Sequence, residues 1–179
     1  MAKKSIAHII EINIDRLAKA NLFIYSLSLC AIIYLIRIFL FIIKRVFLIP
    51  DIEFRERIVN ENLTITVDLI IDTLIIAPLV ETLVFQTLFF YFFKKFNIHK
   101  WIIVLLSAIA FGAYHNYSIF YMIHTGITGF VFMYMYIVRA EMDNKPFLST
   151  ATAHFTLNLT ITIIIIVAHL FKNQIFSKM

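Results

Sequence analysis

The chain has 179 residues, of which 61% are hydrophobic and 15% charged, and its formal net charge is +5 at pH 7. A soluble domain has about 45–50% apolar and about 25% charged residues, so the composition excludes an ordinary soluble domain. It indicates an integral membrane protein that is surrounded by a lipid bilayer. The basic residues lie at the ends of apolar runs, as membrane topology requires, and they need no nucleic acid partner.

Residues 1–20 are expected to form an amphipathic helix on the membrane surface. Their apolar residues recur at helical spacing between charged ones, at Ile6, Ile9, Ile10, Ile14 and Leu17. We expect no cleavable signal peptide, because this region lacks the continuous hydrophobic run that such a peptide needs.

The rest of the chain predicts about five membrane spans, at about 22–43, 67–93, 101–114, 119–138 and 147–171. Arg37 interrupts the first span, and we expect its long side chain to reach the membrane interface. The polar connection 49–65 has the composition of a short surface helix. The predicted fold is therefore an all-α polytopic transmembrane bundle, a single domain over residues 1–179 with its core at about 66–171.

Basic residues also predict the orientation of the bundle. A cytoplasmic N-terminus would leave more Lys and Arg residues inside than outside, among them Lys94, Lys95 and Arg139. We therefore expect a multi-pass protein of the cell membrane with its N-terminus in the cytoplasm. The abundance of Ile, Phe, Lys and Asn favours a bacterial source.

Glu81 lies within the second apolar run, where an unpaired carboxylate costs a few kcal/mol unless it has a partner, a proton or a task. Pro78 removes one helix hydrogen bond just before it, and we expect a kink there. Asp72 points roughly away from Glu81 on an ideal helix. With Asp68, it is expected to face water or an internal partner such as Arg37.

Two further polar constellations lie in other spans, Phe111-Gly-Ala-Tyr-His115 in the third and His154 with Asn158 in the fifth. A single His or Asn in a membrane helix usually makes a helix–helix hydrogen bond. With Glu81, however, the three helices indicate a shared site. Glu81 can act as a general base toward water that His115 orients, while His154 and Asn158 donate to a developing oxyanion. Glu81, His115 and His154 could instead ligate a divalent metal such as Zn²⁺, and the sequence leaves both choices open.

The order and spacing of these motifs resemble the CPBP family of intramembrane peptidases, the CAAX-protease and bacteriocin-processing group also called Abi. That family carries Glu-Glu-x-x-x-Arg after a small residue and a Pro, then Phe-x-x-x-His, then His-x-x-x-Asn or Asp. This chain has Ala77-Pro78-Leu-Val-Glu81-Thr82-Leu-Val-Phe-Gln86, then Phe111-Gly-Ala-Tyr-His115, then His154-Phe-Thr-Leu-Asn158. The resemblance covers roughly residues 75–160. It implies that Glu81 and His115 activate water while His154 and Asn158 stabilise the oxyanion.

The chain departs from the family pattern at two positions, since Thr82 replaces the second Glu and Gln86 replaces the Arg. Both residues can form hydrogen bonds but neither can form an ion pair. We expect them, with Phe111, to contact the substrate.

The predicted function is hydrolysis of a peptide bond in a small peptide or membrane protein, and the resemblance implies bacteriocin self-immunity or peptide processing. One alternative is a non-catalytic membrane scaffold or immunity protein of the same fold. The other is a small proton-coupled transporter, against which the lack of an internal repeat argues.

Overall fold

The computed structural model describes residues 6–47 and 66–176, and these residues form helices and no strand. The helices follow in the order α1 (Ile6–Lys19), α2 (Leu22–Val46), α4 (Val67–Ile71), η1 (Asp72–Ile76), α5 (Ala77–Glu81), η2 (Thr82–Leu88), α6 (Phe89–Lys95), α7 (Lys100–Tyr114), α8 (Ile119–Glu141) and α9 (Pro146–Phe176). The predicted all-α bundle is confirmed, and all five predicted spans are helical. The predicted surface helix within 49–65 lies outside the described residues.

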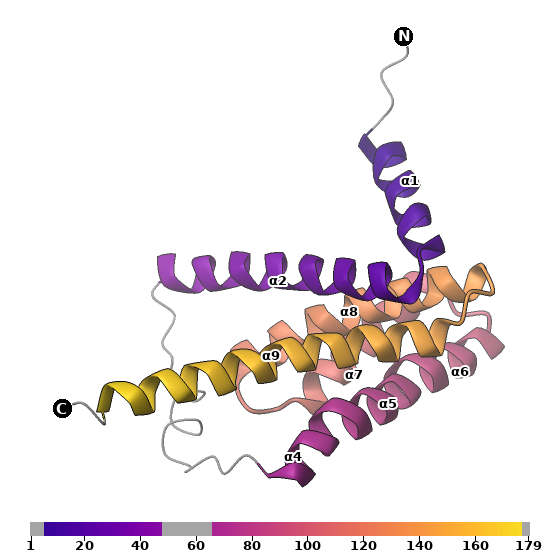
Figure 1. Cartoon of the computed structure of the whole chain (residues 1–179). Coiled ribbons are helices and arrows are strands. Elements are labelled where there is room, and N and C mark those ends of the chain that lie inside the picture. Colours follow the sequence, from indigo (N-terminus) through magenta and orange to yellow (C-terminus); the bar gives the residue numbers. More distant parts are fainter. Residues whose placement is uncertain (1–5, 48–65, 177–179) are drawn as a thin grey trace.

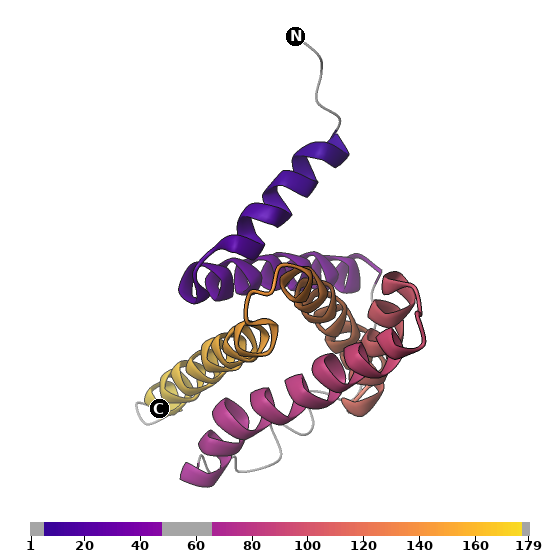
Figure 2. The ribbon, with the colours of Figure 1, turned by 90° about the vertical axis from the view of Figure 1, so that its right-hand side faces the viewer.

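Three of the described helices are long and apolar enough to cross a membrane, namely α2, α8 and the Pro146–Val167 part of α9. Figure 1 shows these three helices side by side, and each packs against the other two. The predicted second span is a continuous helical run of α4, η1, α5, η2 and α6, while α7 is a shorter apolar helix. Figure 2 shows this run and α9 on the side of the bundle away from α1.

Helix α1 projects from the bundle at a steep angle to α2 (Figure 1). The two helices meet at Asn21, whose side chain accepts a hydrogen bond from the Ile24 N–H at 2.9 Å and so begins α2. Ala18 is fully buried, whereas Ile6 and Ile10 are exposed. The predicted N-terminal amphipathic helix is confirmed, and its exposed isoleucines are the groups that a membrane surface would cover.

Arg139 joins the end of α8 to the junction of α1 and α2. Its side chain is buried, and it donates from Nε to the Asn144 carbonyl at 2.9 Å and from Nη1 to the Ala20 carbonyl at 3.3 Å. Asn144 donates in turn to the Ala18 carbonyl at 2.8 Å, and the guanidinium lies 4.4 Å from the ring centroid of Tyr25. The sequence places Arg139 at the end of a span as a topology signal. The structure adds that it is a buried anchor between segments far apart in the sequence.

Glycines allow α7 and α8 to approach closely. A Cβ added at Gly112 would lie 2.6 Å from the Met122 carbonyl oxygen and 3.1 Å from the Gly126 Cα. One added at Gly129 would lie 2.8 Å from the Cβ of Phe111. Because a larger residue at Gly112 would push the helices apart, this glycine helps to set the position of the end of α7.

The helical run that carries Glu81 contains two π-helical segments, η1 and η2, on either side of α5. In η1 the Ala77 N–H bonds the Asp72 carbonyl, five residues earlier. Continued by one residue, this pattern would pair Pro78 with the Thr73 carbonyl, but proline has no N–H. The sequence predicts a kink at Pro78. The structure shows an unbroken helical run with π-helical segments, in which the Thr73 carbonyl is left for a donor from elsewhere.

Candidate active site

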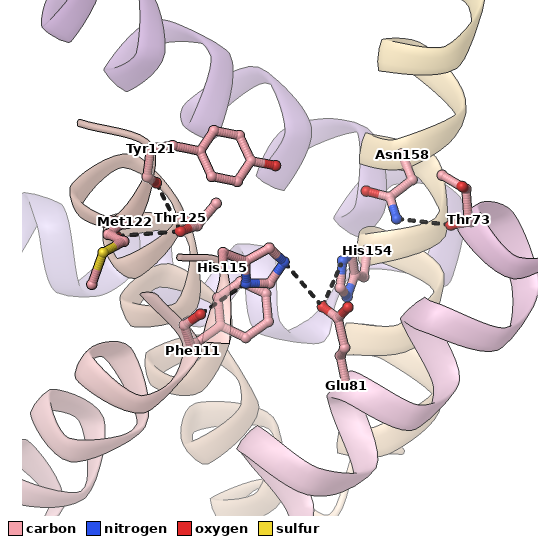
Figure 3. Close-up of polar contacts among 9 residues, drawn as sticks. All are labelled: Thr73, Glu81, Phe111, His115, Tyr121, Met122, Thr125, His154 and Asn158. Atoms are coloured by element: carbon pink, nitrogen blue, oxygen red, sulfur yellow. Dashed lines mark hydrogen bonds and ion pairs between the residues drawn. The ribbon is translucent and has the colours of Figure 1, made fainter. Parts of the chain in front are cut away.

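Three of the four predicted catalytic side chains meet at a single oxygen atom. Glu81 is the last residue of α5, His115 caps the end of α7, and His154 lies in α9. Oε2 of Glu81 lies 3.7 Å from Nε2 of His115 and 3.7 Å from Nε2 of His154, as Figure 3 shows. Three segments spread over more than seventy residues of sequence thus bring a carboxylate and two imidazoles together.

The site is largely enclosed by the bundle. The side chains of Glu81 and His115 are 12% and 16% exposed, and that of His154 is 6% exposed, so His154 lies deepest. Oε2 of Glu81 and Nδ1 of His154 are both buried and have no hydrogen-bond partner among the described residues. A buried polar atom without a partner costs about 1–3 kcal/mol. The arrangement therefore favours binding of a small hydrogen-bond donor next to the carboxylate.

The hydrogen bond of His115 to its own helix decides which ring nitrogen faces Glu81 as an acceptor. Nδ1 of His115 lies 2.8 Å from the Phe111 carbonyl oxygen. Because a carbonyl only accepts, the neutral ring carries its proton on Nδ1 and presents a lone pair at Nε2. Nε2 and the Glu81 carboxylate are then both acceptors, and a water molecule between them can donate one hydrogen to each. The Phe-x-x-x-His spacing places this bond one helical turn back along α7.

Phe111 packs against both imidazoles. Its ring centroid lies 4.6 Å from that of His115 and 5.9 Å from that of His154. The ring of Phe132, a residue of α8, has its centroid 5.1 Å from that of His154. Phe111 is itself buried. These contacts orient the two rings, and the substrate contact expected of Phe111 stays a prediction.

Asn158 points toward the backbone of the neighbouring helix. Its Nδ2 donates to the Thr73 carbonyl at 2.9 Å (Figure 3), the group that Pro78 leaves without a helical donor. No hydrogen bond joins Asn158 to Glu81, both of which the structure describes. Its oxyanion role stays a prediction, whereas the observed bond holds α9, and with it His154, against the helix of Glu81.

Ser107 of α7, like Asn158 of α9, donates a side-chain hydrogen bond to a backbone carbonyl of the helical run that carries Glu81. Its Oγ donates to the Phe85 carbonyl in η2 at 2.6 Å, so α7 is tied to the same helical run. Ser107 was not among the predicted site residues. Its signal was present, because Ser107, Phe111 and His115 are spaced by four residues and share one face of a helix.

Thr82 and Gln86 follow Glu81 in η2 and are fully buried. The Thr82 hydroxyl and both amide atoms of Gln86 have no hydrogen-bond partner within the described part of the chain. Both side chains lie inside the bundle and away from its exposed surface. Their predicted contact with a substrate stays a prediction.

The metal alternative for Glu81, His115 and His154 stays a prediction. In the described ranges, no group of three or more His, Cys, Asp or Glu side chains is arranged to hold a metal ion. Glu81, His115 and His154 are near one another, but they do not form such a group.

Comparison with known families gives one match. The model of the family described as type II CAAX prenyl endopeptidase Rce1-like matches residues 63–160, which include all three motifs around Glu81, His115 and His154. No curated protein and no solved structure matches the chain. The family is one of CAAX intramembrane proteases, and the matched segment makes up more than half of the sequence. The chain therefore belongs to the Rce1-like family of type II CAAX prenyl endopeptidases.

Proposed function

We propose that the protein is an intramembrane endopeptidase that hydrolyses a peptide bond with water activated by Glu81 and His115. The observation that carries this proposal is the position of the Glu81 carboxylate oxygen, 3.7 Å from the Nε2 atoms of two histidines on different helices. Three polar groups converge in an apolar bundle, where desolvation makes electrostatic interactions stronger than in water.

The separation of 3.7 Å suits an intervening group better than a direct bond. Hydrogen bonds between nitrogen and oxygen are about 2.7–3.2 Å long, so neither histidine is directly hydrogen-bonded to Glu81. A water molecule bonded to Glu81 and to His115 would have its oxygen lone pair free for attack. Such distances commonly shorten when a substrate binds.

The reaction then needs only water and the peptide. As the water oxygen bonds to the carbonyl carbon, its proton passes to the Glu81 carboxylate. His154, with a proton on Nε2, donates to the carbonyl oxygen as it becomes an oxyanion. Glu81 returns the proton to the amide nitrogen, the carbon–nitrogen bond breaks, and the products are a carboxylic acid and an amine.

The substrate is expected to be a small peptide or a membrane-associated protein, because the site lies within a bundle of membrane helices. In finer detail, the proposed role is self-immunity to a bacteriocin or processing of a peptide. The proposed location is the cell membrane of a bacterium, with the N-terminus inside. Membership in a protease family supports the peptidase activity in general.

The test is hydrolysis of a library of internally quenched peptides by the full chain in lipid nanodiscs. Glu81→Gln keeps the shape of the side chain but removes the base, so we expect the rate to fall by about 10²–10⁴. Asp72→Asn makes the same chemical change in the same helical run at an exposed position and should leave the rate unchanged. Equal rates for Glu81→Gln and the unmodified chain would refute the proposal. A cellular phenotype that survives Glu81→Gln would favour the non-catalytic scaffold.

A further inference from the structure

Arg37 of α2 lies outside the segment that matches the family, yet it turns into the bundle. Its Nε is buried and has no hydrogen-bond partner among the described residues, and no described carboxylate forms an ion pair with it. The guanidinium carbon lies 5.8 Å from the ring centroid of Tyr34. The sequence predicts that Arg37 reaches the membrane interface or pairs with Asp68 or Asp72. In the structure its side chain lines a hollow with residues of α8 and forms neither pair, and its reach to the membrane interface stays a prediction.

Arg37 lines a narrow hollow between α2 and α8. The other polar side chains of this hollow are His124 and Thr128, and the remaining lining residues are isoleucine and valine. Among the described residues no carboxylate lines the hollow, and none balances the charge of Arg37 there. A partly buried guanidinium without an anion costs free energy, because it has lost hydration without gaining a partner. The Arg37 guanidinium at the edge of this hollow therefore favours contact with an anion.

The charge of Arg37 acts on the side of the bundle that holds the site. Arg37 of α2 and His124 of α8 line the same hollow. The Tyr121 ring contacts both His124 and the site residue His115, with its centroid 6.1 Å from that of His115 and 6.2 Å from that of His124. Near Glu81 itself, the residues Thr82 and Gln86 are neutral and fully buried. Arg37 is thus a source of positive charge for a substrate that lies along α8.

We propose that Arg37 is a specificity-determining residue that binds a carboxylate of the peptide substrate, either its C-terminus or an Asp or Glu side chain. The inference rests on the proposed function, since it assigns a substrate group to the same site. A guanidinium can hold a carboxylate through two parallel hydrogen bonds, and such bonds are strong where water is largely excluded. The phosphate of an anionic lipid offers related chemistry, and the experiment separates the two sources.

The first measurement is peptide binding to the Glu81→Gln chain in nanodiscs of phosphatidylcholine, followed by fluorescence anisotropy. The probes are labelled peptides in pairs that differ by Glu against Gln, or by a C-terminal carboxylate against an amide. We expect the acidic member of at least one pair to bind about tenfold more tightly or better. Adding Arg37→Gln should abolish this preference, whereas Arg37→Lys should keep part of it as a point charge. Arg45→Gln removes an exposed arginine from the same helix and should keep the preference.

The second measurement is thermal unfolding, which separates substrate binding from a structural role. Because Arg37 has no ion pair with a described residue, Arg37→Gln should leave the Tm unchanged or raise it. A fall of several degrees would show that Arg37 stabilises the fold and would overturn the proposal. Equal binding of acidic and neutral peptides would also overturn it. So would displacement of the acidic peptide by phosphatidylglycerol in the nanodisc, because the anion would then be a lipid phosphate.

The outcomes for binding and for hydrolysis are independent. Hydrolysis of acidic and neutral peptides at equal rates, without a binding preference, would leave the peptidase and remove the role of Arg37. An Arg37-dependent preference for acidic peptides, without hydrolysis by the unmodified chain, would support the carboxylate site and refute the peptidase.

Discussion

Substitution of Gly112 by alanine tests how closely the site depends on the packing of α7 against α8. The new Cβ would lie 2.6 Å from the Met122 carbonyl oxygen, a backbone atom that cannot turn aside as a side chain can. Overpacking of this kind costs about 1–3 kcal/mol. The higher helix propensity of alanine offsets at most about 1 kcal/mol of that cost. We therefore expect a net loss of stability of about 1 kcal/mol.

The effect on hydrolysis should be larger than the effect on stability. Relief of the contact must move the end of α7 away from α8 by about half an ångström or more, and His115 follows Gly112 by less than one turn. A displacement of about 1 Å at a reacting group can lower a rate by about 10². We expect the hydrolytic rate of Gly112→Ala to fall by about tenfold or more, measured with quenched peptides beside thermal unfolding of the same sample.

Gly126→Ala is the matched control, because its Cβ would lie 3.2 Å from the Ala108 carbonyl oxygen and 3.8 Å from the Gly112 Cα. It makes the same chemical change on the facing helix with much less crowding, so its rate should stay within about threefold of the unmodified chain. If Gly112→Ala and Gly126→Ala have equal rates and equal Tm values, the close approach does not position His115.

Three further predictions concern the bonds around the site and the fold. Asn158→Leu should lower the free energy of unfolding by about 1–3 kcal/mol, because it leaves the Thr73 carbonyl without a donor. The loss should be smaller in a Pro78→Ala background, which restores an N–H. Equal losses in both backgrounds would contradict the link between Asn158 and Thr73. Arg139→Met should lower stability by about 2 kcal/mol or more in denaturant unfolding, and an unchanged midpoint would show that its bonds to Asn144 and Ala20 contribute nothing. Hydrolysis should continue in an excess of 1,10-phenanthroline, because Glu81 and His115 move the proton; a loss that zinc restores would require a metal.

Local sequence patterns predicted the helices well. The five apolar runs bounded by charges are all helical, because burial of backbone polar groups in a membrane leaves helices as the main choice. The spacing of Phe111 and His115 also predicted a shared helix face. The structure adds the bond between the His115 ring and the Phe111 carbonyl, which follows from the same spacing.

Long-range geometry was harder to predict. The residue type of Asn158 does not show whether its amide donates to an oxyanion or to a backbone carbonyl. The acceptor becomes evident only from the π-helical segment before Pro78, which leaves the Thr73 carbonyl nearby. Arg37 lies near the end of an apolar run, where snorkelling is the usual outcome. Its direction depends on how α2 packs against α8, and single-helix periodicity contains no such information. Asp72 is exposed in the structure, whereas the Glu81 side chain is only 12% exposed.

The buried anchor at Arg139 has a consequence for how the protein is made. Its partners Ala20 and Ala18 precede Arg139 and Asn144 by 119 and 126 residues. At a synthesis rate of about 5–20 residues per second, the start of the chain waits roughly 6–24 seconds for these groups to leave the ribosome. During that interval the junction of the first two helices lacks these neighbours. Assembly of the bundle is therefore a late event of biogenesis, and a nascent chain that stops before residue 139 lacks the contact that joins its two ends.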